Sequence, residues 1–171
     1  FKTTPDCVPH YLDRKNVGLF TKHRVFTETE MHARYEIHLE NYCKVLNIEA
    51  LTMLDMVNKE ILPAVTGYIK ELCDAALTKR SLDAGISSEV ETSLAARLSA
   101  LSASLYKKTG DLNAALMGVK EHPDMEDCAL YYKDRVLVAM QETRAVADEL
   151  ETLTAKKCWP FPTYGDILFS V

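Results

Sequence analysis

A chain of 171 residues with 47% hydrophobic and 26% charged side chains is typical of a soluble globular protein of about one domain. The net charge of −5 comes from 20 basic and 25 acidic residues without a basic block, which argues against a nucleic-acid partner. No apolar run approaches the ~18 residues of a membrane span, and no signal-peptide pattern is visible. We therefore expect a cytoplasmic protein with neither a membrane nor a nucleic acid as partner.

The cysteines are few, odd in number and widely spaced, and none forms a Cys-x-x-Cys pair: Cys7, Cys43, Cys73, Cys128 and Cys158. This spacing makes a disulfide framework or a zinc site improbable, and favours buried thiols in a reducing compartment. The chain starts at Phe1 rather than at a methionine, which suggests a piece of a longer polypeptide.

The N-terminal part predicts a linker followed by a long helix. Residues 1–26 read as an irregular linker around two prolines, with a short helix from about Asp13. Thr27 and Glu30 have the spacing of a capping box, and apolar residues then recur every three or four positions over about 28–82. Because proline lacks an N–H group, we expect a kink at Pro63, and an interruption near Asn47 stays open.

Two further helices are predicted after a break at Gly85. Ser88 is the expected N-cap of a helix over 88–121, with Glu91 as its capping-box acid, and the apolar phase continues through Gly110. Asp124 is expected to open the last helix, which runs to about Lys156. The positions expected to face inward include Ile48, Leu51, Val90 and Leu130.

These elements predict an all-α fold, an elongated antiparallel bundle of three to four long helices. The expected organisation is a linker with a short helix over 1–26, the bundle over 27–158, and a tail over 159–171, as one domain. The tail reads WPFPTYGDILFSV. Its prolines favour an extended path, and its aromatic side chains favour docking, on the bundle or on a part absent from this chain.

Two kinds of metal site would involve the histidines of this chain. A di-iron carboxylate site requires Glu-x-x-His motifs, and glutamate does not precede any histidine by three positions: His10, His23, His32, His38 or His122. A row of side chains at four-residue spacing could in principle bind a metal: Glu28, His32, Glu36 and Glu40. A solvated helix face with pairing to Arg34 and Lys44 is the favoured interpretation.

Other chemistry finds little support in the sequence. Cys43 near a histidine remains open as a nucleophile, but a buried structural thiol fits its place in an amphipathic helix better. Tyr131 and Tyr132 are expected to pack rather than to recognise a ligand. No P-loop or dinucleotide-binding glycine motif occurs. We therefore predict no catalytic, cofactor-binding or metal-binding residue in this chain.

Three stretches resemble the C-terminal region of type III glutamine synthetases. They are RYEIHLENYCKVLNIEALTMLDMVNKEILPAV from Arg34, QETRAVADELETL from Gln141, and the tail WPFPTYGDILFSV. With TTPDCVPHY near the start, the resemblance covers essentially the whole chain in the family's order. It implies an ATP- and magnesium-dependent ligase that joins ammonia to glutamate and assembles into large ring-based homo-oligomers.

The resemblance also implies what this chain lacks. The family's nucleotide, metal and glutamate residues lie upstream, in a β-grasp part and a catalytic barrel, and the conserved run of the catalytic domain has no counterpart here. The implied role is an accessory domain, inactive alone, that begins just after the barrel. It would pack subunits by contacting the barrel of its own polypeptide and neighbouring subunits. The alternatives are a free-standing helical interaction module without enzymatic activity, and a helical enzyme with its own metal or thiol site.

Overall fold

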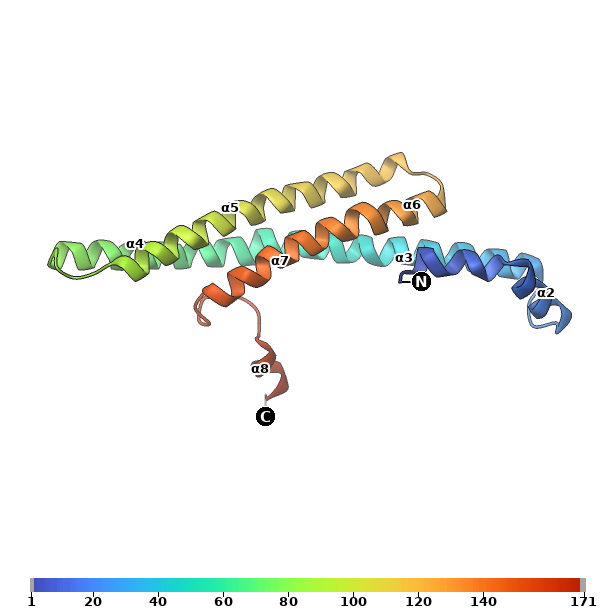
Figure 1. Ribbon diagram of the computed structural model, residues 1–171, viewed down its shortest axis with the longest axis horizontal. Coiled ribbons are helices and arrows are strands. Elements are labelled where there is room, and N and C mark those ends of the chain that lie inside the picture. Colours follow the sequence, from blue (N-terminus) through green and yellow to red (C-terminus); the bar gives the residue numbers. More distant parts are fainter. Residues whose placement is uncertain (1, 170–171) are drawn as a thin grey trace. The chain divides into compact units, whose positions relative to one another are not determined.

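The computed structural model describes residues 2–169, except for the side chain of Tyr164 (Figure 1). Over these residues the chain is built from helices and connecting turns without a β-strand, which confirms the all-α class. Contacts divide it into two compact units, Phe1–Thr52 with Leu112–Met140, and Met53–Asp111 with Gln141–Val171. The boundaries expected after residues 26 and 158 stay predictions. No helix in the described part is long and apolar enough to cross a bilayer.

The N-terminal residues are more helical than the sequence predicted. They form α1 (Thr4–Cys7), the 3₁₀ helix η1 (Val8–Leu12) and α2 (Arg14–Lys22), so an irregular start is wrong and a short helix near Asp13 is confirmed. The amide of Thr3 donates to the carboxylate of Asp6 at 3.2 Å, as in a capping box. A proline at the first turn of a helix loses no hydrogen bond, so Pro5 and Pro9 fit there.

The long helix α3 (Glu28–Met56) begins as predicted. The amide of Thr27 donates to the Glu30 carboxylate at 2.7 Å, and the amide of Glu30 donates back to the Thr27 hydroxyl at 3.2 Å. The question left open at Asn47 is answered by the structure, because the helix continues through this residue. The side-chain oxygen of Asn47 accepts a hydrogen bond from Tyr132 at 3.2 Å, so this amide does not compete for the helix backbone.

The disturbance expected at Pro63 is a single π-helical turn. η2 (Val57–Ile61) separates α3 from α4 (Leu62–Leu82), and the amide of Leu62 donates to the carbonyl of Val57, five residues back. Because Pro63 has no N–H group, the carbonyl four positions before it loses its helical donor. Widening the turn before the proline lets the helix continue, which explains why the apolar phase survives.

The later helices follow the predicted plan with shorter ends. α5 (Glu89–Gly118) runs unbroken through Gly110 and finishes in the 3₁₀ turn η3 (Val119–Glu121). Asp124 caps α6 (Met125–Tyr131), accepting from the amide of Asp127 at 3.0 Å. The π-helical turn η4 (Tyr132–Val136) connects it to α7 (Leu137–Leu153). The helix ends before Lys156 because the amides of Cys158 and Trp159 close a separate turn on the carbonyl of Ala155.

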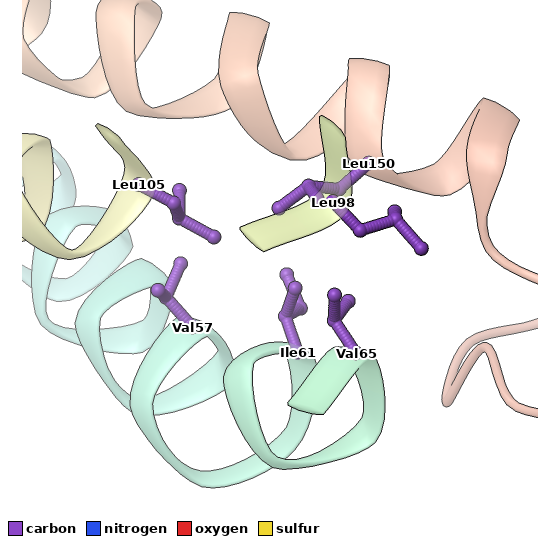
Figure 2. Close-up of a cluster of buried hydrophobic side chains, with 6 residues drawn as sticks. All are labelled: Val57, Ile61, Val65, Leu98, Leu105 and Leu150. Carbon is purple, nitrogen blue, oxygen red and sulfur yellow. The ribbon is translucent and has the colours of Figure 1, made fainter. Parts of the chain in front are cut away.

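The core of the second unit is one cluster of side chains from three helical segments (Figure 2). η2 and α4 contribute three β-branched residues, α5 two leucines and α7 one, each at most 5% exposed: Val57, Ile61, Val65, Leu98, Leu105 and Leu150. Their steps of four and seven residues keep them on one helix face. Burial of such side chains stabilises the fold by about 1.5–3 kcal/mol each.

Some apolar residues expected to face inward are exposed, because the apolar stripes are narrower than the sequence suggests. Ile48 is 63% exposed and Leu51 is 51% exposed, whereas Leu46 and Ala50 are buried. At roughly 100° per residue, neighbours one or two positions away point to another side of the helix. The same correction applies to Val90 at 73% and Leu130 at 38%.

The tail is not extended throughout. Residues Tyr164–Leu168 form a short helix, α8, whose N-cap Thr163 accepts from the amide of Asp166 at 3.3 Å. The carboxylate of Asp166 accepts in turn from the Thr163 amide at 2.9 Å. This capping box folds the chain back into a helix directly after the proline pair. Ser170 and Val171, also part of the predicted tail, lie outside the described residues.

Candidate functional site

The acidic row on α3 is a solvated surface. Glu28, His32 and Glu36 are exposed, and Glu40 pairs with Lys44 at 2.6 Å. Arg34 lies over the ring of Phe26, with its guanidinium carbon 4.3 Å from the ring centroid. Within residues 2–169, no three histidine, cysteine or acidic side chains come together in a way that could hold a metal ion. The arrangement accounts for the charges of the row by exposure and local pairing.

Cys43 is buried as the sequence predicted, and it faces a second thiol that the sequence did not identify as its neighbour. Burial raises the pKa of Cys43 to about 12, and the hydrogen-bonded thiol of Cys128 adds to this effect. A thiol with so high a pKa is protonated at neutral pH, and the thiolate is the nucleophilic form. Cys43 in this environment is therefore a packing residue rather than an activated nucleophile.

The paired tyrosines fix helices to one another within the first unit. The hydroxyl of Tyr131 donates to the carbonyl of Ala115 at 3.0 Å, and that of Tyr132, only 4% exposed, donates to Asn47. Tyr35 donates to Glu126 at 2.9 Å, and burial followed by this acidic neighbour raises its pKa to about 12. These hydroxyls are already bonded, as expected for side chains that pack.

The first unit also contains two surface hollows. One has a volume of about 380 Å³ and is lined by Cys7, Val8, His10, Tyr11, Asn16 and His38. The other, about 460 Å³, is lined by Lys2, Thr3, Thr4, Cys7, Val8, Tyr42, Leu46 and Leu137. In the first hollow, Nδ1 of His10 lies 3.2 Å from the carboxylate of Asp13. The first hollow thus combines a thiol and two histidines with apolar side chains, and one of these histidines, His10, is paired with Asp13.

An ion pair that was not predicted from the sequence holds the N-terminal turn of the first unit. The ammonium group of Lys133 in η4 lies 2.7 Å from the carboxylate of Asp6 in α1, and both side chains are mostly buried. Lys133, followed by Thr3, lowers the pKa of Asp6 to about 2. The Thr-x-x-Asp spacing from Thr3 would have predicted the capping half of this arrangement, whereas no local pattern indicates Lys133.

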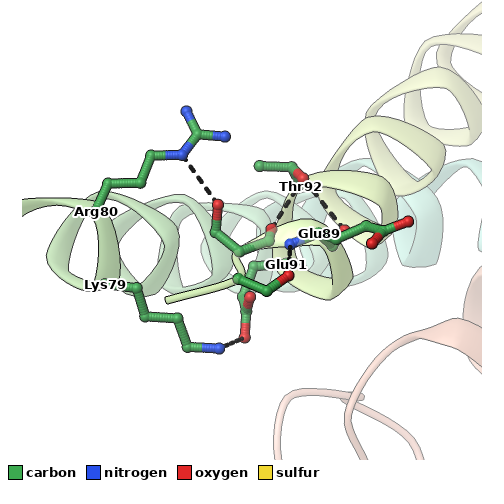
Figure 3. Close-up of polar contacts among 7 residues, drawn as sticks. Lys79, Arg80, Glu89, Glu91 and Thr92 are labelled. Carbon is green, nitrogen blue, oxygen red and sulfur yellow. Dashed lines mark hydrogen bonds and ion pairs between the residues drawn. The ribbon is translucent and has the colours of Figure 1, made fainter. Parts of the chain in front are cut away.

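The connection between α4 and α5 in the second unit is bonded by side chains (Figure 3). Lys79 pairs with Glu91 at 2.6 Å, and Nε of Arg80 donates to the hydroxyl of Ser88 at 2.9 Å. Lys79 lowers the pKa of Glu91. α5 begins after Ser88 as predicted, but the two side chains expected to form its capping box bind α4 instead. They therefore join the two helix ends across the loop.

The C-terminal segment, defined here as residues 159–169, has an anchored part and an exposed part. Trp159 and Phe161 pack against the core of the second unit, with ring centroids 6.3 Å apart in an edge-to-face arrangement. The ammonium group of Lys156 lies 2.6 Å from the carboxylate of Asp166, and this pair with Thr163 lowers the pKa of Asp166 to about 2. Beyond it three apolar side chains are 61%, 72% and 80% exposed: Ile167, Leu168 and Phe169.

A family model and several known proteins are similar to this chain. Residues 1–80 match the family model described as the glutamine synthetase C-terminal domain. A glutamine synthetase of Butyrivibrio fibrisolvens is 36% identical over 99% of this chain, which covers 24% of that protein. A type-3 glutamine synthetase of Dictyostelium discoideum is 28% identical over 98% of the chain and 23% of its own length.

A third relative agrees with these two. A glutamine synthetase of Bacteroides fragilis is 24% identical over 97% of the chain and 23% of its own length. The chain thus spans about a quarter of the length of the relatives it matches, and the match runs almost from one end of the chain to the other. The resemblance found in the sequence is therefore confirmed: the chain matches the glutamine synthetase C-terminal domain over residues 1–80 and aligns over nearly its whole length with relatives named glutamine synthetase.

Proposed function

We propose that this chain is the accessory C-terminal domain of a full-length glutamine synthetase, an ATP- and magnesium-dependent ligase of ammonia and glutamate. The observation that carries the proposal is the alignment over 99% of the chain with 24% of a glutamine synthetase. The catalytic, nucleotide and metal residues then belong to the remaining length of the polypeptide. The chain alone is inactive in this proposal, and the whole enzyme acts in the cytoplasm.

The second part of the proposal is that the domain helps to assemble subunits. One face of α3 supports it, because three large apolar side chains are 51–63% exposed there: Ile37, Ile48 and Leu51. At 100° per residue they lie within roughly 60° of one another around the helix, so they form one α3 apolar row. An exposed apolar surface of this kind marks contact with another protein surface. The partners proposed are the catalytic barrel of the same polypeptide and neighbouring subunits in a homo-oligomer.

The activity test compares the complete polypeptide from its source with the 171-residue chain alone. Glutamine formation is measured from glutamate, ammonia and Mg-ATP. The complete protein is expected to make glutamine, and the 171-residue chain alone is expected to make none. A native polypeptide of about the 19.3 kDa of this chain, without synthetase activity, would instead establish a free-standing interaction module.

The assembly test measures particle mass by light scattering. Ile37→Ser with Ile48→Ser in the complete enzyme is expected to release smaller particles. The matched control is Leu77→Ser, since Leu77 is 65% exposed on α4 and lies outside the α3 apolar row. An unchanged particle mass in the double variant, or an equal loss in the control, contradicts an assembly role for this row.

A further inference from the structure

We propose that Ile167, Leu168 and Phe169 at the end of α8 dock on the catalytic part of the glutamine synthetase polypeptide, outside this chain. The inference rests on the proposed function and identifies the surface and partner that the C-terminal segment uses. These residues are named below as the α8 apolar end. Their exposed fractions are 61%, 72% and 80%.

The α8 apolar end is carried by an anchor. Trp159 and Phe161, which precede it by a few residues, pack against the buried cluster of the second unit. Prolines at 160 and 162 fix the backbone angles between and after these rings, which limits the paths the chain can take. The α8 apolar end therefore follows an anchored part of the chain and does not belong to a freely moving terminus.

The short helix is also held in its conformation before any partner binds. A helix of five residues is not stable by itself in water. Here the hydroxyl of Thr163 donates to Asp166 at 2.7 Å, and the amide of Thr163 donates to the same carboxylate at 2.9 Å. Lys156 pairs with this carboxylate at 2.6 Å. Asp166 thus joins the start of α8 to the end of the preceding turn, and preorganisation of this kind reduces the entropy lost on binding.

The contrast within the segment indicates docking. Its first two aromatic residues contact the core, whereas its last three large apolar residues are mostly in water. Contiguous exposed apolar groups bordered by charged residues, here Asp166 and Lys156, mark a protein contact. A segment that served only to cover the second unit would bury its apolar end as it buries Trp159.

The part of the relatives that does not align with this chain indicates which partner the α8 apolar end contacts. The alignments place about three quarters of each relative outside this chain, so the largest surface available to the segment belongs to that part. A second copy of α8 fits less well. Stable association needs about 800 Å² from each partner, and three side chains at the end of a five-residue helix cannot supply that area to one another. A preformed surface of the catalytic part can enclose them instead.

The test places a photoreactive probe at the end of the segment in the complete enzyme. Phe169→p-benzoylphenylalanine keeps an aromatic side chain at a position that is 80% exposed, so the substitution is not expected to disturb the fold. After irradiation, cross-linked peptides are mapped by mass spectrometry. The expected result is a cross-link to residues outside the 171 of this chain. Cross-links only to this region of a second copy, only within the same chain, or to nothing would overturn the proposal.

A second variant gives an independent readout. Leu168→Ser with Phe169→Ser is expected to expose the segment in the complete enzyme and to raise about tenfold the rate at which chymotrypsin cleaves after Tyr164, a site that both proteins keep, because proteolysis follows the population of the open form. Leu82→Ser is the matched control, since Leu82 is 79% exposed on α4. Equal cleavage of the segment in the double variant and the unchanged enzyme would overturn docking.

Failure of the docking inference and failure of the proposed function give different results. If the complete polypeptide forms glutamine but the probe at position 169 does not reach its catalytic part, only the docking inference is wrong. If the complete polypeptide forms no glutamine from its substrates, the proposed function is wrong, and the named partner falls with it.

Discussion

The ammonium group of Lys133 lies 2.7 Å from the carboxylate of Asp6, although 127 positions separate them in the chain. The pair joins α1 to the π-helical turn η4, and it lowers the pKa of Asp6 from 3.8 to about 2. A carboxylate whose pKa is lowered on folding stabilises the folded state above its unfolded pKa and loses that contribution as the pH falls through its folded pKa. The contribution of Asp6 is therefore complete above about pH 4 and disappears towards about pH 2.

Replacement of Asp6 by asparagine tests this relationship. Asp6→Asn is expected to lower the urea midpoint at pH 6. Between pH 4 and pH 2, the free energy of unfolding of this variant is expected to fall less than that of the unchanged chain. Asp134→Asn is a suitable control, because Asp134 lies 4.0 Å from Lys133 and is 64% exposed. Urea unfolding followed by circular dichroism measures both variants. Parallel pH curves for Asp6→Asn and the unchanged chain would show that the pair does not contribute.

The buried cluster of the second unit predicts a large difference between two leucines. Leu98 is fully buried in that cluster, so Leu98→Ala is expected to lower the free energy of unfolding by about 2–5 kcal/mol. Leu82 is 79% exposed, and Leu82→Ala is expected to change it by less than about 0.5 kcal/mol. Chemical denaturation of the two variants under identical conditions measures both values. Similar losses would mean that the cluster in Figure 2 is not the core of this unit.

The single tryptophan provides a reporter of the C-terminal segment. Trp159 packs partly buried against the core, so Trp159→Ala is expected to destabilise the chain by about 2 kcal/mol. Phe169→Ala removes a ring that is 80% exposed and is expected to leave the stability of this chain nearly unchanged. Acrylamide quenching of Trp159 gives the second measurement. Quenching as efficient in the native state as in urea would contradict packing of Trp159.

The cysteines should differ strongly in reactivity. Cys7 and Cys73 are exposed, whereas Cys43 is buried with a pKa raised to about 12. Because the thiolate is the reacting form, Ellman's reagent at pH 8 is expected to modify Cys7 and Cys73 first and Cys43 last. Peptide mapping of alkylated protein at successive times identifies each site, and Cys7→Ser with Cys73→Ser should remove the rapid phase. Early modification of Cys43 would show that its environment is open to solvent.

Helix starts could be read from the sequence because their causes are local. Thr27 with Glu30 satisfies the free amide groups of one helix start, and Asp124 does so at another. The same local pattern at Ser88 and Glu91 misled, since Lys79 and Arg80 on the preceding helix bind these side chains. A capping pattern therefore predicted where α5 begins but not which hydrogen bonds are made there.

The irregularities of the helices were only partly predictable. Pro63 predicted a disturbance, because its missing N–H group is a property of the residue, and the π-helical turn η2 lies directly before it. The second π-helical turn, η4, contains no proline, and no sequence signal indicated it. Its residues make tertiary contacts instead, with Tyr132 bonded to Asn47 and Lys133 bonded to Asp6.

The helical class, most helix boundaries, the continuity of α5 through Gly110 and the family resemblance follow from the sequence, because periodicity, caps and long motifs are local properties of the chain. Which apolar residues are buried, by contrast, depends on tertiary contacts. Ile48 and Leu46 are equally hydrophobic in character, yet one is 63% exposed and the other 7%. Their difference depends on what packs against each side of α3, and residues distant in the sequence supply those neighbours. The same reason explains why Asp6 with Lys133, and Cys43 with Cys128, were found only in the folded chain.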